Sequence, residues 1–167
     1  MTQDERFMTE ALRLAAEAAA EGEVPIGCVV TLDGTIVGRG RNSRETGKNA
    51  LHHAEILAID EACRTLGGWR LPRCRLYVTL EPCPMCAGAI INARIPTVIY
   101  GARDPKAGSL SSVVQLFELP YNHKPQVISG VLEEQCGEIL RSFFRTLRRK
   151  KPQKQPCVPP AKAPQNH

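Results

Sequence analysis

Two short segments of the chain carry side chains that are suited to bind a metal ion. One is a His-Ala-Glu segment at residues 53–55, and the other is a Cys-Pro-Met-Cys segment at residues 83–86. Zinc prefers imidazole nitrogens and cysteine thiolates in tetrahedral geometry, and a catalytic zinc ion keeps one coordination position open for water. His53, Cys83 and Cys86 supply three such ligands, and cysteines three residues apart on a helix lie on one face. The spacing therefore predicts a zinc site with an open position.

Glu55 is the side chain best placed to assist chemistry at such a site. Residues i and i+2 do not share a face in the middle of a helix, but at the first turn both can point past the helix end. A carboxylate beside a zinc-activated water can accept a proton and return it to the substrate. Glu55 is therefore the candidate catalytic acid and base.

Two other interpretations of the cysteine pair stay open at this point. A thioredoxin-type redox pair has the same spacing, but it leaves His53 and Glu55 without a role. A structural zinc site needs a fourth ligand. The next candidates, Cys74 and Cys136, fall in a predicted strand and in the predicted last helix.

The elements that must position these side chains alternate between strands and helices. A capping-box pattern of Thr2 and Glu5 predicts a helix to about residue 20, and Asp33-Gly34 predicts a hairpin turn. Strands are expected at residues 25–30, 35–38, 74–80, 97–102 and 126–129, and further helices at about 53–66, 83–93 and 131–150, with one more near 111–117. This order predicts an α/β fold, a three-layer α/β/α sandwich around a five-stranded mixed sheet whose N-terminal hairpin adds one antiparallel strand. In such folds, sites form where strands end and helices begin.

Composition limits the class of protein. The 167 residues, 43% of them apolar, suffice for one folded domain and exclude wholesale disorder. No apolar run approaches the ~18 residues of a membrane span, and the acidic N-terminus does not resemble a secretory signal. Seven cysteines without such a signal favour a reducing compartment, so a cytoplasmic location is expected. We expect one domain at residues 1–151 and a disordered tail at 152–167, where five prolines oppose regular structure.

Basic residues are concentrated at the C-terminal end of the chain. No acidic residue follows Glu138, whereas residues 139–167 contain eight lysines and arginines. Such a block is either a solvated tail or a surface that binds a polyanion, and the charge alone does not decide between them.

The metal-binding segments show the His-x-Glu and Pro-Cys-x-x-Cys pattern that is known from zinc-dependent nucleobase deaminases. The chain resembles the cytidine/deoxycytidylate deaminase superfamily and, within it, the bacterial tRNA-specific adenosine deaminases, over residues 5–150. The segments that carry this resemblance are residues 23–27, 40–42, 53–56, 76–89, 100–106 and 142–145. Residues 107–112 depart from the family pattern, which implies a reshaped edge of the substrate pocket.

The resemblance implies a cytidine-deaminase-like fold with one Zn²⁺ per subunit and an activity on RNA. The implied reaction is hydrolytic deamination of the wobble adenosine (position 34) of tRNA to inosine, with release of ammonia. Glu55 would move a proton from the attacking water to the adenine ring. Asn42 would contact the bound nucleoside, Asp104 would lie beside the RNA cleft, and Asn122 would match an asparagine of a later loop.

The resemblance also assigns a role to the basic last helix. Phe143 would stack near a splayed base, and Arg145 and Arg148 would contact phosphates or base edges, as single-stranded RNA recognition requires. The implied partners are the anticodon stem-loop of tRNA and a second copy of the chain in a homodimer. No membrane and no organic cofactor is expected.

Three other functions stay possible from the sequence. A deaminase of a free base or nucleoside, such as guanine or cytosine, would use the same zinc chemistry but would not need the basic helix. A non-enzymatic zinc or RNA-binding module would have no use for Glu55. An inactive tRNA-binding relative would be expected to lack at least one of the catalytic residues.

Overall fold

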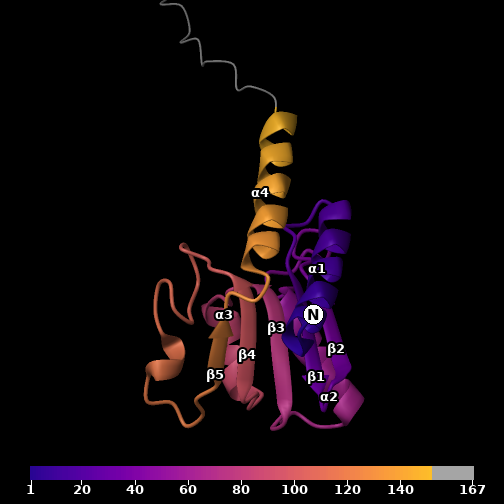
Figure 1. Cartoon of the computed structure of the whole chain (residues 1–167). Coiled ribbons are helices and arrows are strands. Elements are labelled where there is room, and N and C mark those ends of the chain that lie inside the picture. Colours follow the sequence, from indigo (N-terminus) through magenta and orange to yellow (C-terminus); the bar gives the residue numbers. More distant parts are fainter. Residues whose placement is uncertain (152–167) are drawn as a thin grey trace, which may run out of the picture.

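The computed structural model describes residues 1–151, in which a five-stranded sheet lies between two pairs of helices (Figure 1). The strands are β1 (Gly27–Leu32), β2 (Thr35–Arg41), β3 (Cys74–Leu80), β4 (Thr97–Ala102) and β5 (Gln126–Ser129). The helices are α1 (Gln3–Ala20), α2 (Ala54–Leu66), α3 (Pro84–Asn92) and α4 (Glu133–Lys150), with a short 3₁₀ helix, η1 (Leu116–Glu118). The tail predicted at residues 152–167 lies outside the described residues.

The sheet has the strand order β2-β1-β3-β4-β5. β1 pairs antiparallel with both β2 and β3, whereas β3–β4 and β4–β5 are parallel pairs. The hairpin therefore contributes one antiparallel strand, as predicted, and that strand lies inside the sheet. At the turn, Asp33 and Gly34 both have positive φ angles, which confirms the predicted hairpin.

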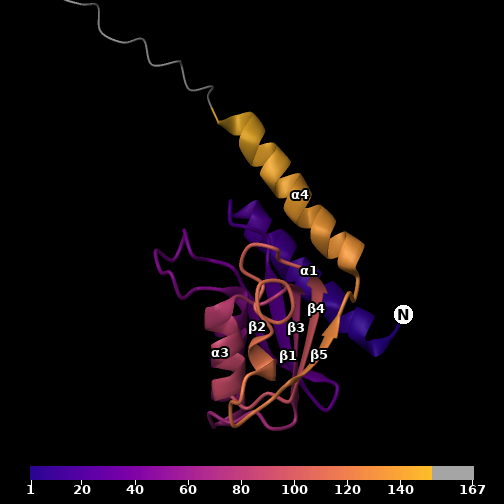
Figure 2. The same ribbon diagram turned by 90° about the vertical axis from the view of Figure 1, so that its left-hand side faces the viewer.

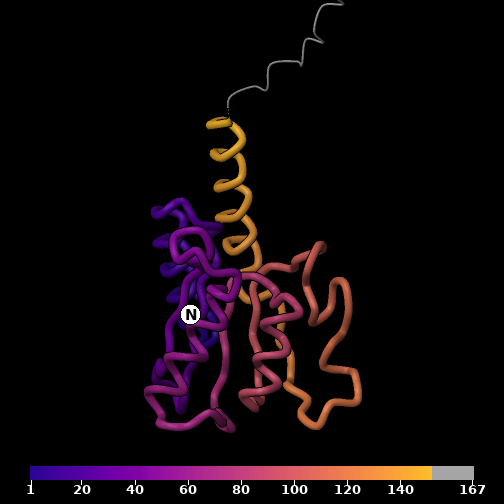
Figure 3. The backbone as a smooth tube through the Cα atoms, turned by 180° about the vertical axis from the view of Figure 1, so that it is seen from behind, coloured from indigo at the N-terminus to yellow at the C-terminus, as the bar shows by residue number. Residues whose placement is uncertain are grey.

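The helices cover both faces of the sheet, as the three-layer prediction requires. Alternate strand residues point to opposite faces. Val29, Tyr77 and Ile99 pack with apolar residues of α1 and α4, and Val30, Leu76 and Val98 pack with those of α2 and α3. Figures 2 and 3 show α3 on one side of the sheet and α1 on the other, with the end of α4 projecting beyond the body.

The strand predicted at residues 35–38 extends to Arg41, and the helix predicted from residue 131 begins at Glu133. Two further differences have a local reason. The first strand begins at Gly27 rather than residue 25, and Pro25 has no amide hydrogen to give to a ladder. The helix expected near residues 111–117 is reduced to η1. The amides of Val113 and Leu116 donate to the carbonyl oxygens of Gly108 and Ser109, five and seven residues earlier, so the four-residue hydrogen-bond spacing of an α-helix is not formed there.

Helix α2 can approach the sheet because β2 carries glycine at position 40. A Cβ atom there would lie 2.1 Å from the carbonyl oxygen of Ala54 and 2.7 Å from the amide nitrogen of Ala58. Both atoms belong to the backbone of α2, so they cannot move without moving the helix. The glycine therefore sets the position of the helix whose N-terminus carries His53 and Glu55.

Replacing this glycine is expected to destabilise the fold. Gly40→Ala should lower the free energy of unfolding by about 3 kcal/mol, since the added methyl group overlaps helix backbone. The control is Gly68→Ala, where no atom lies within 4 Å of the new Cβ. Urea unfolding should show a lower midpoint for Gly40→Ala only, and equal midpoints would contradict the packing argument.

Within residues 1–151, no helix is both long and apolar enough to cross a membrane.

Candidate active site

The three predicted metal ligands lie at the N-termini of two helices. His53 is the N-cap residue of α2, and Cys83 is the N-cap residue of α3. Pro84 starts α3, where its fixed φ angle suits the first helical position, and Cys86 follows one turn later. Both helix starts face the carboxyl end of β3. The partial positive charge of a helix N-terminus favours the thiolate form of cysteine.

The distances between the ligand atoms fit one tetrahedral ion. His53 Nδ1 lies 3.6 Å from Cys83 Sγ and 3.6 Å from Cys86 Sγ. Metal–ligand bonds of about 2.1 Å to nitrogen and 2.3 Å to sulfur, at tetrahedral angles, separate such atoms by about 3.6 Å. Across the part of the chain that the structure describes, this is the only group of three such side chains whose ligand atoms converge. Cys74 and Cys136 are not part of it.

Hydrogen bonds among His53, Cys83 and Cys86 shift the pKa of each side chain. A hydrogen bond from the Cys86 thiol, and a further one from His53, lower the pKa of Cys83 to about 4 although burial opposes this. The same hydrogen bond to Cys83, together with burial, raises the pKa of the Cys86 thiol. Hydrogen bonding to Cys83 also raises the pKa of His53. The site therefore holds one thiolate, and a metal ion must displace protons from Cys86 and, in acid, from His53.

Glu55 is a buried carboxyl group beside these ligands. Its residue is 4% exposed, and burial raises its pKa to about 7, with a further upward contribution from the negative charge of Cys83. A carboxyl group whose pKa lies near neutrality can take up and release a proton at the pH of a cell. A structural metal site or a redox pair would give this side chain no function.

These side chains open into a cleft of about 460 Å³. His53, Glu55 and Cys83 line it from the helix starts, and Leu140 and Phe144 line it from α4. The loops around it contribute cationic side chains, Arg44, Arg103 and Lys106. A buried polar centre with a cationic rim suits an uncharged reacting group that is attached to a polyanion.

The structure places two predicted substrate-binding residues next to the metal site. Asn42 is buried and lines a small cavity of about 100 Å³ together with His53. Its side-chain amide donates to the carbonyl oxygen of Val24 at 3.2 Å. Asp104 lines the main cleft, and its carboxylate accepts from the amides of Lys106 and Ala107 at 3.0 and 3.3 Å.

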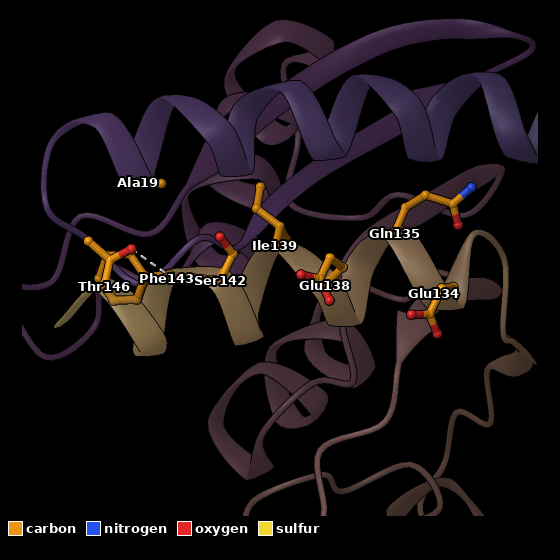
Figure 4. Close-up of a pocket in the computed structure, with 8 residues that line it drawn as sticks. All are labelled: Ala19, Glu134, Gln135, Glu138, Ile139, Ser142, Phe143 and Thr146. Atoms are coloured by element: carbon orange, nitrogen blue, oxygen red, sulfur yellow. Dashed lines mark hydrogen bonds between the residues drawn. The ribbon is translucent and has the colours of Figure 1, made fainter. Parts of the chain in front are cut away.

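The aromatic pair of α4 divides between two surfaces. Phe143, the predicted stacking residue, lines a groove of about 850 Å³ between α1 and α4 with Ile139 and Ser142 (Figure 4). Phe144 lines the cleft beside His53 and Glu55. The structure thus brings Phe144, rather than Phe143, to the metal site.

The remaining predicted residues lie away from the ligands. Arg145 is exposed and pairs with Glu138 at 2.6 Å, and Arg148 is exposed on the projecting part of α4. Asn122 is exposed and precedes β5, next to His123, whose ring bonds the carbonyl of Ile95. Since β4 and β5 are parallel, this loop lies at their amino ends, opposite the metal site.

Phe144 and Arg44 are cleft residues that the sequence interpretation missed. Phe144 follows Leu140 by four residues, and both line the cleft, so helical spacing could have grouped them. It could not have shown which face of α4 meets the metal site. Arg44 lies in an irregular loop, where the sequence carries no periodic signal.

The known proteins that this chain resembles include deaminases, which agrees with a metal site beside a buried carboxyl group. The sequence pattern of the MafB19-like deaminase family matches residues 2–148. The tRNA-specific adenosine deaminase of Bacillus subtilis is 53% identical over 152 residues, covering 90% of this chain and 94% of the relative. A structure from a study of A-to-I editing by tRNA:A34 deaminases at the wobble position has 48% identity and a TM-score of 0.79, and the match covers 81% of this chain and 99% of that one. The guanine deaminase of Nitrosomonas europaea, 24% identical with a TM-score of 0.70 over 84% of each chain, shares the fold.

Proposed function

This chain belongs to the family of tRNA-specific adenosine deaminases, and we propose that it converts the wobble adenosine of tRNA to inosine by zinc-dependent hydrolytic deamination. One observation carries the proposal. The buried Glu55 carboxyl group lines the same cleft as His53 and Cys83, and the ligand atoms of these two residues converge with that of Cys86 on one metal position.

The residues of the chain account for the proton transfers of this reaction. Bound zinc would supply Lewis acidity and lower the pKa of a water molecule in its open coordination position. Glu55 accepts a proton from the attacking water and delivers it to N1 of adenine, while the water oxygen bonds to C6. The second proton then passes through Glu55 to the amino group, which leaves C6 as ammonia. One water is consumed, and inosine and ammonia are formed.

The rim of the cleft supports an RNA substrate over a free base. Arg44, Arg103 and Lys106 can bind phosphates, and Phe144 offers a face on which a base can stack. Arg148 follows Phe144 by four residues and therefore extends the same side of α4. Arg145 can join them, because its exposed pair with Glu138 is weak in water. A free purine has no phosphate groups for these cations to bind.

The test of the proposal is a direct assay of products. The zinc-loaded protein is incubated with an anticodon stem-loop RNA that carries adenosine at the wobble position, and separately with guanine, cytosine and adenosine. Nucleoside mass spectrometry should detect inosine from the stem-loop only. Deamination of a free base alone would overturn the proposed substrate and leave the metal chemistry in place.

Zinc binding should weaken steeply in acid. Binding displaces the proton of Cys86 and, below the raised pKa of His53, a second proton, so the zinc-bound form holds fewer protons than the metal-free form. The dissociation constant is expected to rise by at least about tenfold per pH unit as the pH falls from 7 to 5. Titration against a chromophoric chelator measures it, and an affinity independent of pH would contradict this ligand set.

A homodimer is part of the proposal. The outer side of α3 carries the half-exposed residues Met85, Gly88 and Ala89, and Val113 of the loop near α3 is 59% exposed. A second copy covering this apolar side would remove it from water. Gel filtration with light scattering should give the mass of two chains, and a monomer at micromolar concentration would refute it. We also propose a cytoplasmic location, because the six described cysteines are not paired in disulfides and a reducing compartment keeps cysteines unpaired.

A further inference from the structure

Glu81 is a buried carboxylate that the proposed reaction does not use. It follows β3, two residues before Cys83, and is 2% exposed. Its backbone amide donates to the carbonyl oxygen of Ala102 at 2.8 Å, which joins the carboxyl ends of β3 and β4. Burying a carboxylate costs free energy unless its oxygens accept hydrogen bonds. All the hydrogen-bond donors to the Glu81 carboxylate belong to one loop.

The loop at residues 104–112 is organised around this carboxylate. Oε2 accepts from the successive amides of Leu110, Ser111 and Ser112 at 3.2, 2.9 and 3.0 Å. Oε1 accepts from the amide of Asp104 at 3.2 Å and from the hydroxyl of Ser112 at 2.5 Å. Five donors from both ends of the loop thus meet one side chain, and hydrogen bonds to a charged acceptor are the stronger kind.

Gly108 allows the middle of the loop to pass over the same carboxylate. A Cβ atom at this position would lie 2.4 Å from Oε2 of Glu81 and 2.4 Å from the carbonyl oxygen of Asp104. Glycine is therefore the residue that lets the backbone come this close. The position of the loop therefore depends on two features. Its donors bind the carboxylate of Glu81, and the absence of a side chain at position 108 lets the backbone approach that carboxylate.

The wall of the cleft depends on the position of this loop. Asp104, Lys106 and Ala107 line the cleft, and Glu81 lines it as well. We infer that Glu81 is a positioning residue that holds residues 104–112 as the RNA-binding wall of the cleft and sets substrate affinity rather than the rate of the chemical step. This inference rests on the proposed function.

Two variants disturb this arrangement from opposite sides. Glu81→Gln keeps the shape of the side chain but turns an amide N–H₂ group toward amide donors. Gly108→Ala keeps the carboxylate and places a methyl group against it. The matched controls are Glu23→Gln, another buried glutamate, whose carboxylate binds the amide of Thr46 in a different loop, and Gly68→Ala, which meets no atom within 4 Å.

The experiment combines hydrogen exchange, metal analysis and kinetics on the zinc-loaded full-length protein. In both variants, amide exchange at residues 104–112 should rise at least about tenfold, with zinc still at one ion per chain. Neither control should change exchange in this loop. On stem-loop RNA, KM should rise about tenfold, equivalent to about 1.4 kcal/mol, and kcat should stay within about twofold of the wild type.

The outcomes separate this inference from the proposed function. A wild-type protein that does not deaminate the stem-loop would refute the proposed function and, with it, the role in RNA binding. An active wild type whose KM is unchanged by Glu81→Gln would overturn the inference alone. So would faster exchange throughout the chain, or loss of zinc, since Glu81 would then act through global stability or through Cys83. A merely structural role lowers stability without separating KM from kcat.

Discussion

Glu55→Gln is expected to lower kcat for deamination of the stem-loop by about 10³-fold while zinc stays bound at one ion per chain. The amide has the size of the carboxyl group but cannot take a proton from water and return it to the substrate. General acid–base groups typically contribute about 10²–10⁴-fold to a rate. Single-turnover assays and metal analysis on the same preparation measure the two quantities.

The control for this variant lies on the same helix. Asp60→Asn also converts a carboxylate to an amide on α2, but its side chain is exposed and pairs only with Arg64. This variant should keep wild-type kcat. Retained activity in zinc-loaded Glu55→Gln would show that another group carries the proton, whereas loss of zinc would show that Glu55 supports the metal site instead.

The same substitution should change the stability of the metal-free protein. Burial raises the pKa of Glu55 from 4.5 to about 7, so the folded state holds this proton more tightly than the unfolded state does. Stability is therefore lost as the pH rises from 4.5 toward 7, by roughly 3 kcal/mol for this group. Cys83, whose pKa is lowered, and His53, whose pKa is raised, also make stability depend on pH, but they are present in both proteins. Urea unfolding at pH 4.5 and pH 7 should therefore show that the metal-free wild type loses stability relative to Glu55→Gln over this range. The catalytic carboxyl group is thus kept at a cost in stability, as is common at active sites.

Cys86→Ala is expected to abolish zinc binding and, with it, all measurable deamination. The alanine removes one of three protein ligands, and two ligands do not hold zinc against a chelator. Inductively coupled plasma mass spectrometry after dialysis against a chelator should find close to no zinc. Since a ligand that binds only the folded state stabilises it, zinc should also cease to raise the melting temperature.

Cys74→Ala is the matched control for this variant. Cys74 is buried to the same degree as Cys86 but lies in β3 outside the metal-binding trio. Its replacement should cost about 1 kcal/mol through lost packing, with zinc at one ion per chain and kcat unchanged. Stoichiometric zinc in Cys86→Ala, or loss of zinc in Cys74→Ala, would mean that the ligand set is a different one.

The sequence alone determined the parts of this protein that depend on local chemistry. The strands at 74–80, 97–102 and 126–129 are found at the predicted residues, because alternation and β-branched residues mark them locally. The capping box at Thr2 and the turn at Asp33-Gly34 are likewise present. The ligand trio converges because residues 53 and 83–86 each start a helix, a position that proline and turn chemistry predict.

Only the tertiary structure decided which other residues lie beside the three metal ligands. Phe143 and Phe144 are neighbours on a helix, and only the packing of α4 against α1 and the sheet turns Phe144 to the cleft. Asn122 is separated from the metal site by the length of a parallel strand pair. The loop at 104–112 takes its shape from Glu81, more than twenty residues earlier in the chain. Such contacts join residues that are distant in sequence, so no local pattern of residue types encodes them.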